Sequence, residues 1–101
     1  MRLMIFFDLP TLTASDRRNY RQFRKMLINE GFLMIQESVY VRVAMNRKSA
    51  DFLVKRVAQL CPKSGIVQSL MITENQYASI EFLAGNPIED VRNSDAKVVV
   101  I

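Results

Sequence analysis

The sequence predicts an α+β domain with the ferredoxin-like βαββαβ arrangement, followed by an extra C-terminal strand. The apolar patterns run in the order strand, helix, two strands, helix, two strands, which matches this arrangement. The chain has 101 residues, half of them hydrophobic, enough for one core. A polar segment also separates the last apolar run from the rest. We expect residues 1–84 to form the domain, with both helices on one face of its sheet.

The first strand is expected over residues 2–7, an apolar run without helical spacing that Pro10 ends. Such a run is typical of a central strand that is buried on both faces. Helical periodicity follows over residues 15–30. Thr13 or Ser15 is available as its N-cap, and Gly31 follows as its stop signal.

Residues 32–44 are rich in β-branched and aromatic side chains but turn polar at residues 36–38, which predicts two short strands or one bent strand. A second helix is expected over residues 48–60, and Pro62 closes it. Its apolar face would comprise Ala50, Leu53, Val54, Val57, Leu60 and Cys61.

Residues 65–73 and 76–83 are apolar runs around a two-residue polar turn, which predicts a hairpin. The linker over residues 84–96 is polar, and residues 97–101 are almost wholly β-branched. An apolar strand at the end of a chain needs a sheet edge. We therefore expect residues 85–101 to be a linker and a strand that pairs with the partner protomer of a homodimer.

Composition excludes several kinds of site. Histidine is absent, which rules out a His-ligated zinc site and a Ser-His triad. Cys61 is the one cysteine, so no intrachain disulfide can form, and a reducing compartment is favoured. The N-terminal apolar run is too short for a signal peptide or a membrane span. We expect a cytoplasmic protein that does not bind membranes.

The first predicted helix is basic. Fourteen Lys and Arg against ten Asp and Glu give the chain a formal charge of +4. Five cations share about a third of the circumference of this helix, namely Arg17, Arg18, Arg21, Arg24 and Lys25. Arginine forks match phosphate, which favours nucleic-acid binding over a face that merely keeps the helix solvated. A second basic group could extend the surface, namely Arg42, Arg47, Lys48, Lys55 and Arg56.

Asp8 ends the first strand and is the candidate catalytic residue and metal ligand, although turn or cap roles are common for such a residue. One carboxylate per chain suits Mg²⁺, or another divalent ion such as Mn²⁺, only if two copies share it across a dimer. Ser38 and Tyr40 are supporting candidates. Ser38 suits a backbone contact at a strand bend, and Tyr40 suits packing or base stacking.

In order and spacing, several segments resemble the smaller of the two universal CRISPR adaptation proteins. They are the strand ending in Asp8, Arg17-Arg18, Lys25-Met26-Leu27, Glu30-Gly31-Phe32 and Gln36-Glu37-Ser38-Val39-Tyr40. The resemblance implies a ferredoxin-like homodimer that joins the CRISPR integrase subunit and helps to capture and insert spacer DNA. It further implies a magnesium-dependent endonuclease that acts on single-stranded RNA or double-stranded DNA.

Residue by residue, the resemblance implies that Asp8 is the metal ligand and that Arg17 and Arg18 match family arginines. It also matches Ser38 and Tyr40, with tyrosine where others often have phenylalanine. Two alternatives stay open. One is a scaffold that binds duplex DNA without cutting it, and the other is a ferredoxin-like regulatory domain for a small ligand. Steep weakening of binding by salt would favour nucleic acid over the small ligand.

Overall fold

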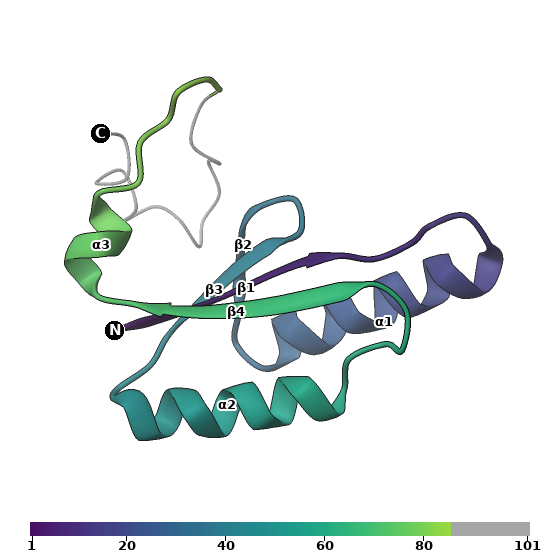
Figure 1. The fold of residues 1–101 in the computed structure, drawn as a ribbon, viewed down its shortest axis with the longest axis horizontal. Coiled ribbons are helices and arrows are strands. Elements are labelled where there is room, and N and C mark those ends of the chain that lie inside the picture. The colour runs from purple at the N-terminus through teal and green to yellow at the C-terminus, as the bar shows by residue number, and fades with distance from the viewer. Residues whose placement is uncertain (86–101) are drawn as a thin grey trace.

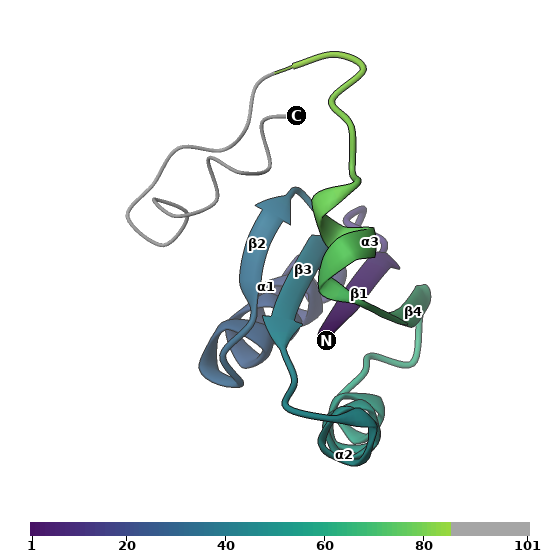
Figure 2. The ribbon, with the colours of Figure 1, turned by 90° about the vertical axis from the view of Figure 1, so that its left-hand side faces the viewer.

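The computed structural model describes residues 1–85. Its elements in chain order are β1 (Arg2–Asp8), α1 (Ala14–Asn29), β2 (Leu33–Gln36), β3 (Val39–Val43), α2 (Arg47–Gln59), β4 (Ile66–Ile72) and α3 (Glu74–Ala78). The strands form one antiparallel sheet in the order β2-β3-β1-β4, visible from left to right in Figure 2. Both long helices lie on the same side of this sheet (Figure 1). The predicted βαββαβ arrangement is therefore confirmed, whereas the expected terminal strand lies outside the described residues.

Strand β1 is central, as predicted, but it is fully buried on one face only. Leu3, Ile5 and Phe7 alternate along it and are at most 7% exposed, packing with Phe23 and Leu27 of α1. The residues between them are half-buried, because α1 and α2 cover only the other face of the sheet. The expectation of burial on both faces is wrong for this reason. We call the face away from α1 and α2 the open face.

Local hydrogen bonds set both ends of α1. Thr13 is the N-cap, and its side chain and that of Asp16 form a reciprocal capping box. At the other end the N–H groups of Gly31 and Phe32 donate to the carbonyls of Ile28 and Leu27. This Schellman pattern requires a left-handed residue, and Gly31 has φ +90°. The predicted stop is therefore confirmed.

The turn between β2 and β3 explains the polar interruption at residues 36–38. Two short strands form rather than one bent strand, and their register shifts between Met34 and Gln36. Ser38 has φ +65°, a left-handed conformation that suits a tight hairpin turn.

Helix α2 begins after the cap Asn46 and buries Ala50, Leu53 and Val57. Leu60 was expected on that apolar face but is 52% exposed, because the helix has already ended at this residue. None of the helices in residues 1–85 combines the length and apolar character needed to cross a bilayer.

The predicted hairpin after residue 65 is half wrong. Strand β4 forms, but residues 76–83 form no second strand, and the short helix α3 takes their first part. Thr73 Oγ1 accepts from the Gln76 N–H, and the Gln76 side chain accepts from the Thr73 N–H. This capping box starts a helix where a turn was expected. Tyr77 then packs under the Arg2 guanidinium, which lies 4.2 Å from the ring centroid.

Candidate functional site

The five predicted cations of α1 form one exposed row on the outer side of the helix, which we call the basic ridge. Its residues are Arg17, Arg18, Arg21, Arg24 and Lys25. Phe23 and Leu27 on the opposite side of α1 are buried in the core. None of the five cations forms an ion pair within residues 1–85. The ridge therefore presents uncompensated positive charge to solvent.

Arg24 and Tyr40 are brought together, although they come from different elements. The Arg24 Nε donates to Tyr40 Oη at 2.9 Å. Tyr40 is only 1% exposed, and its ring stacks on Phe7 with centroids 5.8 Å apart. The Tyr40 hydroxyl thus reaches the edge of the core and holds one nitrogen of a ridge arginine.

Arg17 is held in a similar way at the start of the ridge. Its Nη1 donates to the carbonyl oxygens of Thr11 and Leu12, both at 3.1 Å. These carbonyls belong to the loop between β1 and α1. The remaining guanidinium nitrogens of Arg17 have no other partner within the described part of the chain.

The second basic group is partly used inside the fold. The Arg42 Nη1 donates to the Glu30 carbonyl, and the Arg56 Nη2 pairs with Glu30 Oε2 at 2.7 Å. Both cations lie at the C-terminus of α1, where the helix dipole favours positive charge. Lys48 and Lys55 are exposed on α2. Arg42 and Arg56 therefore stabilise the packing at the end of α1. The second basic group does not extend the basic ridge as a continuous row of unpaired cations.

Asp8 lies at the end of β1, exposed and opposite Ile66 of β4. Alternation along the strand places Asp8 on the open face together with Met4 and Phe6. A Cβ on Gly65 would lie 2.6 Å from the Asp8 carbonyl, so the backbone of the next strand passes very close. No ion pair or side-chain hydrogen bond joins Asp8 to the basic ridge within residues 1–85.

One protomer does not build a multidentate metal site from its described residues. No group of three or more Asp, Glu, Cys or His side chains gathers in residues 1–85. A carboxylate oxygen is the hard ligand that Mg²⁺ prefers, but the ion is usually held by one or two carboxylates together with waters. Asp8 therefore fits such an ion only as one part of a larger ligand set.

The open face carries exposed apolar side chains along the length of β1, from Val43 opposite Arg2 to Ile66 opposite Asp8. Val43 on β3 is 56% exposed, and Ile66 and Leu70 on β4 are 60% and 51% exposed. Register pairs Ile66 with Asp8 and Leu70 with Met4. Sequence reasoning missed this face because it treated β1 as buried on both sides. The exposure of Ile66 and Leu70 on β4 depends on which face of the sheet the helices cover.

Ser38 sits beside the end of β1 in the turn between β2 and β3. The Phe7 N–H donates to the Ser38 carbonyl at 3.1 Å. The side-chain oxygens of Ser38 and Tyr20 lie 3.3 Å apart. Ser38 thus ties the turn to β1 and α1, while no His exists in the chain to activate its hydroxyl.

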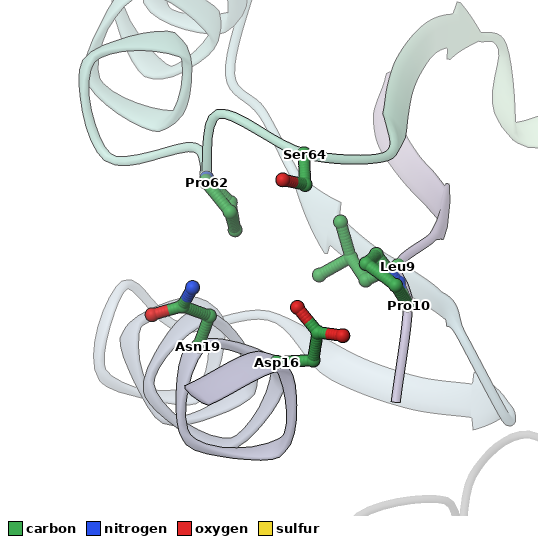
Figure 3. Close-up of a pocket in the computed structure, with 6 residues that line it drawn as sticks. All are labelled: Leu9, Pro10, Asp16, Asn19, Pro62 and Ser64. Atoms are coloured by element: carbon green, nitrogen blue, oxygen red, sulfur yellow. The ribbon is translucent and has the colours of Figure 1, made fainter. Parts of the chain in front are cut away.

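A shallow depression lies beside Leu9 and Pro10, just after β1, and its lining includes none of the predicted site residues (Figure 3). It lies between the β1–α1 loop, the first turns of α1 and the loop before β4. Asp16 and Asn19 face Pro62 and Ser64 across it. Asp16 already accepts the Thr13 N–H in the capping box, so its carboxylate belongs to the helix start.

Comparisons with known proteins agree on one family. The profile described as CRISPR associated protein Cas2 matches residues 1–80. Two relatives named CRISPR-associated endoribonuclease Cas2 align over all of this chain and all of their own length. The protein of Ligilactobacillus salivarius is 55% identical, and that of Lacticaseibacillus rhamnosus is 57% identical.

A solved structure is similar in fold. The crystal structure of Streptococcus pyogenes Cas2 at pH 6.5 superposes with a TM-score of 0.63 at 19% identity. The match covers 83% of this chain and 100% of that one. At this identity the similarity supports the fold alone.

Proposed function

This chain belongs to the Cas2 family of CRISPR-associated proteins, and from that premise we propose that it acts in CRISPR adaptation. In this proposal it is a nucleic-acid-binding homodimer with metal-dependent endonuclease activity. The observation that carries the proposal is the position of Asp8. This carboxylate lies on the same open face as the exposed apolar residues of β3 and β4.

A homodimer that associates through the open face would account for the exposed apolar side chains and for the position of Asp8 among them on that face. Exposed side chains such as Ile66 and Leu70 would be removed from water by a second copy, which stabilises association. A twofold axis repeats every contact, so each Asp8 would face the equivalent region of its partner. Two carboxylates could then approach one another at the ends of the two β1 strands.

Paired Asp8 carboxylates fit a divalent ion better than one does. Two carboxylates, waters and a substrate phosphate oxygen make the ligand set that Mg²⁺ or Mn²⁺ accepts. When bound, such an ion supplies positive charge that polarises a phosphodiester and assists attack by water. The role of Asp8 is to hold the ion at the interface, next to the loop that leads into α1.

The basic ridge of α1 would bind the nucleic-acid backbone. Arginine donates two parallel hydrogen bonds to a phosphate, and each contact releases counterions from the polymer. These contacts fix the strand without reading its sequence. In adaptation, the same surface on two protomers would hold duplex DNA while the dimer joins the integrase subunit as a scaffold.

RNA is the substrate we expect for cleavage, because the relatives with 55% and 57% identity bear the name endoribonuclease. A cleavage assay on single-stranded RNA and on duplex DNA, with and without Mg²⁺, tests this. Asp8→Asn should abolish the metal-dependent product. Asp51→Asn, which removes an exposed carboxylate on α2, is the matched control and should cut normally. Cleavage that survives Asp8→Asn would overturn the catalytic part.

A scaffold without catalysis is the second candidate function. It is favoured by the lack, within residues 1–85 of one protomer, of any group of three or more Asp, Glu, Cys or His side chains that could hold a metal ion. In that case Asp8→Asn would change neither nucleic-acid binding nor spacer acquisition, and the intact protein would give no metal-dependent product.

Binding that does not weaken as salt is raised would instead favour a small-ligand regulatory domain.

A further inference from the structure

We propose that Tyr40 is a positioning residue for nucleic-acid binding, acting through Arg24. The inference rests on the proposed function, because it assumes that the basic ridge binds phosphate. It adds a role for a core side chain that itself faces no solvent. The Tyr40 hydroxyl orients the Arg24 guanidinium before any ligand arrives.

The geometry of the pair carries this inference. Arg24 donates its Nε, the inner nitrogen of the guanidinium, to Tyr40 Oη at 2.9 Å. The two terminal nitrogens stay available, with no partner in residues 1–85, on a residue that is exposed overall. A phosphate can therefore accept hydrogen bonds from the two terminal nitrogens of Arg24 while Nε continues to donate to the Tyr40 hydroxyl.

The hydroxyl itself is held by the core. Tyr40 is 1% exposed, and its position on β3 is opposite Ile5 in the centre of the sheet. Its ring packs against Phe7, which in turn contacts Phe23 and Tyr20 edge to face. A close-packed ring cannot swing, so the acceptor stays at one point beside α1.

Holding a long side chain lowers the entropic cost of binding. Ordering a rotamer-rich side chain at an interface weakens association by roughly two- to tenfold, and a side chain that is already ordered avoids this loss. Arg17 is anchored by a similar device, with its Nη1 on the carbonyls of Thr11 and Leu12. The side chains of two ridge arginines, Arg17 and Arg24, are thus ordered by contacts within the protein before a ligand binds.

The test compares duplex DNA affinities of four chains by fluorescence anisotropy over a series of salt concentrations. They are the intact protein, Tyr40→Phe, Arg24→Gln and the double variant. Tyr40→Phe should weaken binding roughly two- to tenfold at every salt concentration with the salt slope unchanged, because no charge is removed. Arg24→Gln should weaken binding and reduce the slope by about 0.9 for each phosphate that is no longer neutralised.

The double variant shows whether Tyr40 affects DNA binding through Arg24 or independently of it. If Tyr40 acts through Arg24, then Tyr40→Phe should have no further effect once Arg24 is gone. Tyr20→Phe is the matched control, because it removes a hydroxyl that contacts Ser38 rather than an arginine, and it should bind normally. Losses that add up in the double variant, or a Tyr40→Phe protein with intact affinity, would overturn the inference.

A second measurement is made on the intact protein, and a variant serves only to assign the signal. The Arg24 Nε proton, assigned by its loss in Arg24→Gln, should exchange slowly with solvent in the intact protein before and after DNA is added. Fast exchange in the free protein would overturn the inference. An Arg24→Gln protein that binds DNA normally would overturn the role of this ridge position itself, and thereby the inference as well. Weaker binding by Arg24→Gln with normal binding by Tyr40→Phe would overturn the inference alone.

Discussion

Glu30 and Arg56 form an ion pair between the end of α1 and the last turn of α2, with Nη2 and Oε2 2.7 Å apart. The Glu30 carbonyl meanwhile accepts a hydrogen bond from Arg42 of β3. Helix α1 has no basic residue in its own last turn. Two arginines from other elements therefore supply the positive charge that its C-terminus favours.

Glu30→Gln should lower the free energy of unfolding by about 1 kcal/mol or less, because the pair is partly exposed and its Coulomb term is screened. The Arg42 bond to the backbone survives the change. Urea unfolding at fixed protein concentration measures the effect, and the loss should shrink at high salt. Glu37→Gln, in the exposed hairpin turn, is the control and should unfold like the intact protein. A loss that does not depend on salt would contradict an ionic contribution.

Gly65→Ala should destabilise the fold more than Gly31→Ala does. Both glycines have φ near +90°, which costs any L side chain about 1–2 kcal/mol. At Gly31 the new Cβ would meet only the Arg42 side chain, at 3.5 Å or more. At Gly65 it would lie 2.6 Å from the Asp8 carbonyl and 2.8 Å from Leu9 Cδ2.

Because the new Cβ at position 65 overlaps its neighbours, Gly65→Ala should lower the free energy of unfolding by about 1–3 kcal/mol more than Gly31→Ala does. Because the strand carrying Asp8 must move, metal-dependent cleavage should fall in Gly65→Ala and persist in Gly31→Ala. Thermal unfolding and the RNA cleavage assay measure the two effects at a temperature where both variants are folded. Equal losses of stability would show that backbone strain alone is responsible.

The regular elements with strong local patterns could be predicted from the sequence. Helix α1 has a clear 3.6-residue period, the cap Thr13 and the stop Gly31, and all three behave as expected. The strand predicted over residues 76–83 rests on apolar content, but the capping box that Thr73 and Gln76 form starts a helix there. That signal was visible in the sequence as Thr-x-x-Gln before a short polar run.

The details of the site depend on non-local packing, which periodicity does not contain. The charges of the basic ridge could be read from a helical wheel. The contact of Arg24 with Tyr40 joins residues 16 positions apart on different elements, so it required the register of β3 against β1. The exposure of the open face likewise depended on both helices packing on one side.

Cys61 should react with thiol reagents only at a pH above that needed for the unfolded chain. Burial raises the pKa of the Cys61 thiol, which also donates to the Val57 carbonyl at 3.2 Å. The folded protein then keeps the proton in the pH range between the unfolded and the folded pKa. This group therefore stabilises the fold below its unfolded pKa, and the contribution is lost as pH rises through the folded value.

Alkylation by iodoacetamide, followed by mass spectrometry across a pH series, measures the thiol pKa directly. The chain has one cysteine, so the signal belongs to a single site. The same series in urea gives the unfolded reference. Coincident pH midpoints in the two series would contradict a thiol whose proton is held by burial.

Leu70 and Leu60 offer a matched test of the dimer interface. Their exposed fractions are nearly equal, 51% and 52%, but Leu70 lies on the open face and Leu60 follows the end of α2. A charge placed in a buried apolar interface is costly to desolvate, whereas the same charge in solvent is not. Leu70→Lys should therefore shift the solution mass from two chains toward one, and Leu60→Lys should leave it at two.

Analytical ultracentrifugation at several protein concentrations measures this shift. Because Leu70 is opposite Met4 on the strand that carries Asp8, a monomeric Leu70→Lys protein should also lose metal-dependent cleavage. Its basic ridge stays intact, so residual DNA binding should remain salt-dependent. If Leu70→Lys stayed dimeric, or if Leu60→Lys became monomeric, the two Asp8 carboxylates would not meet across the open face, and the proposed metal site would lose its second ligand.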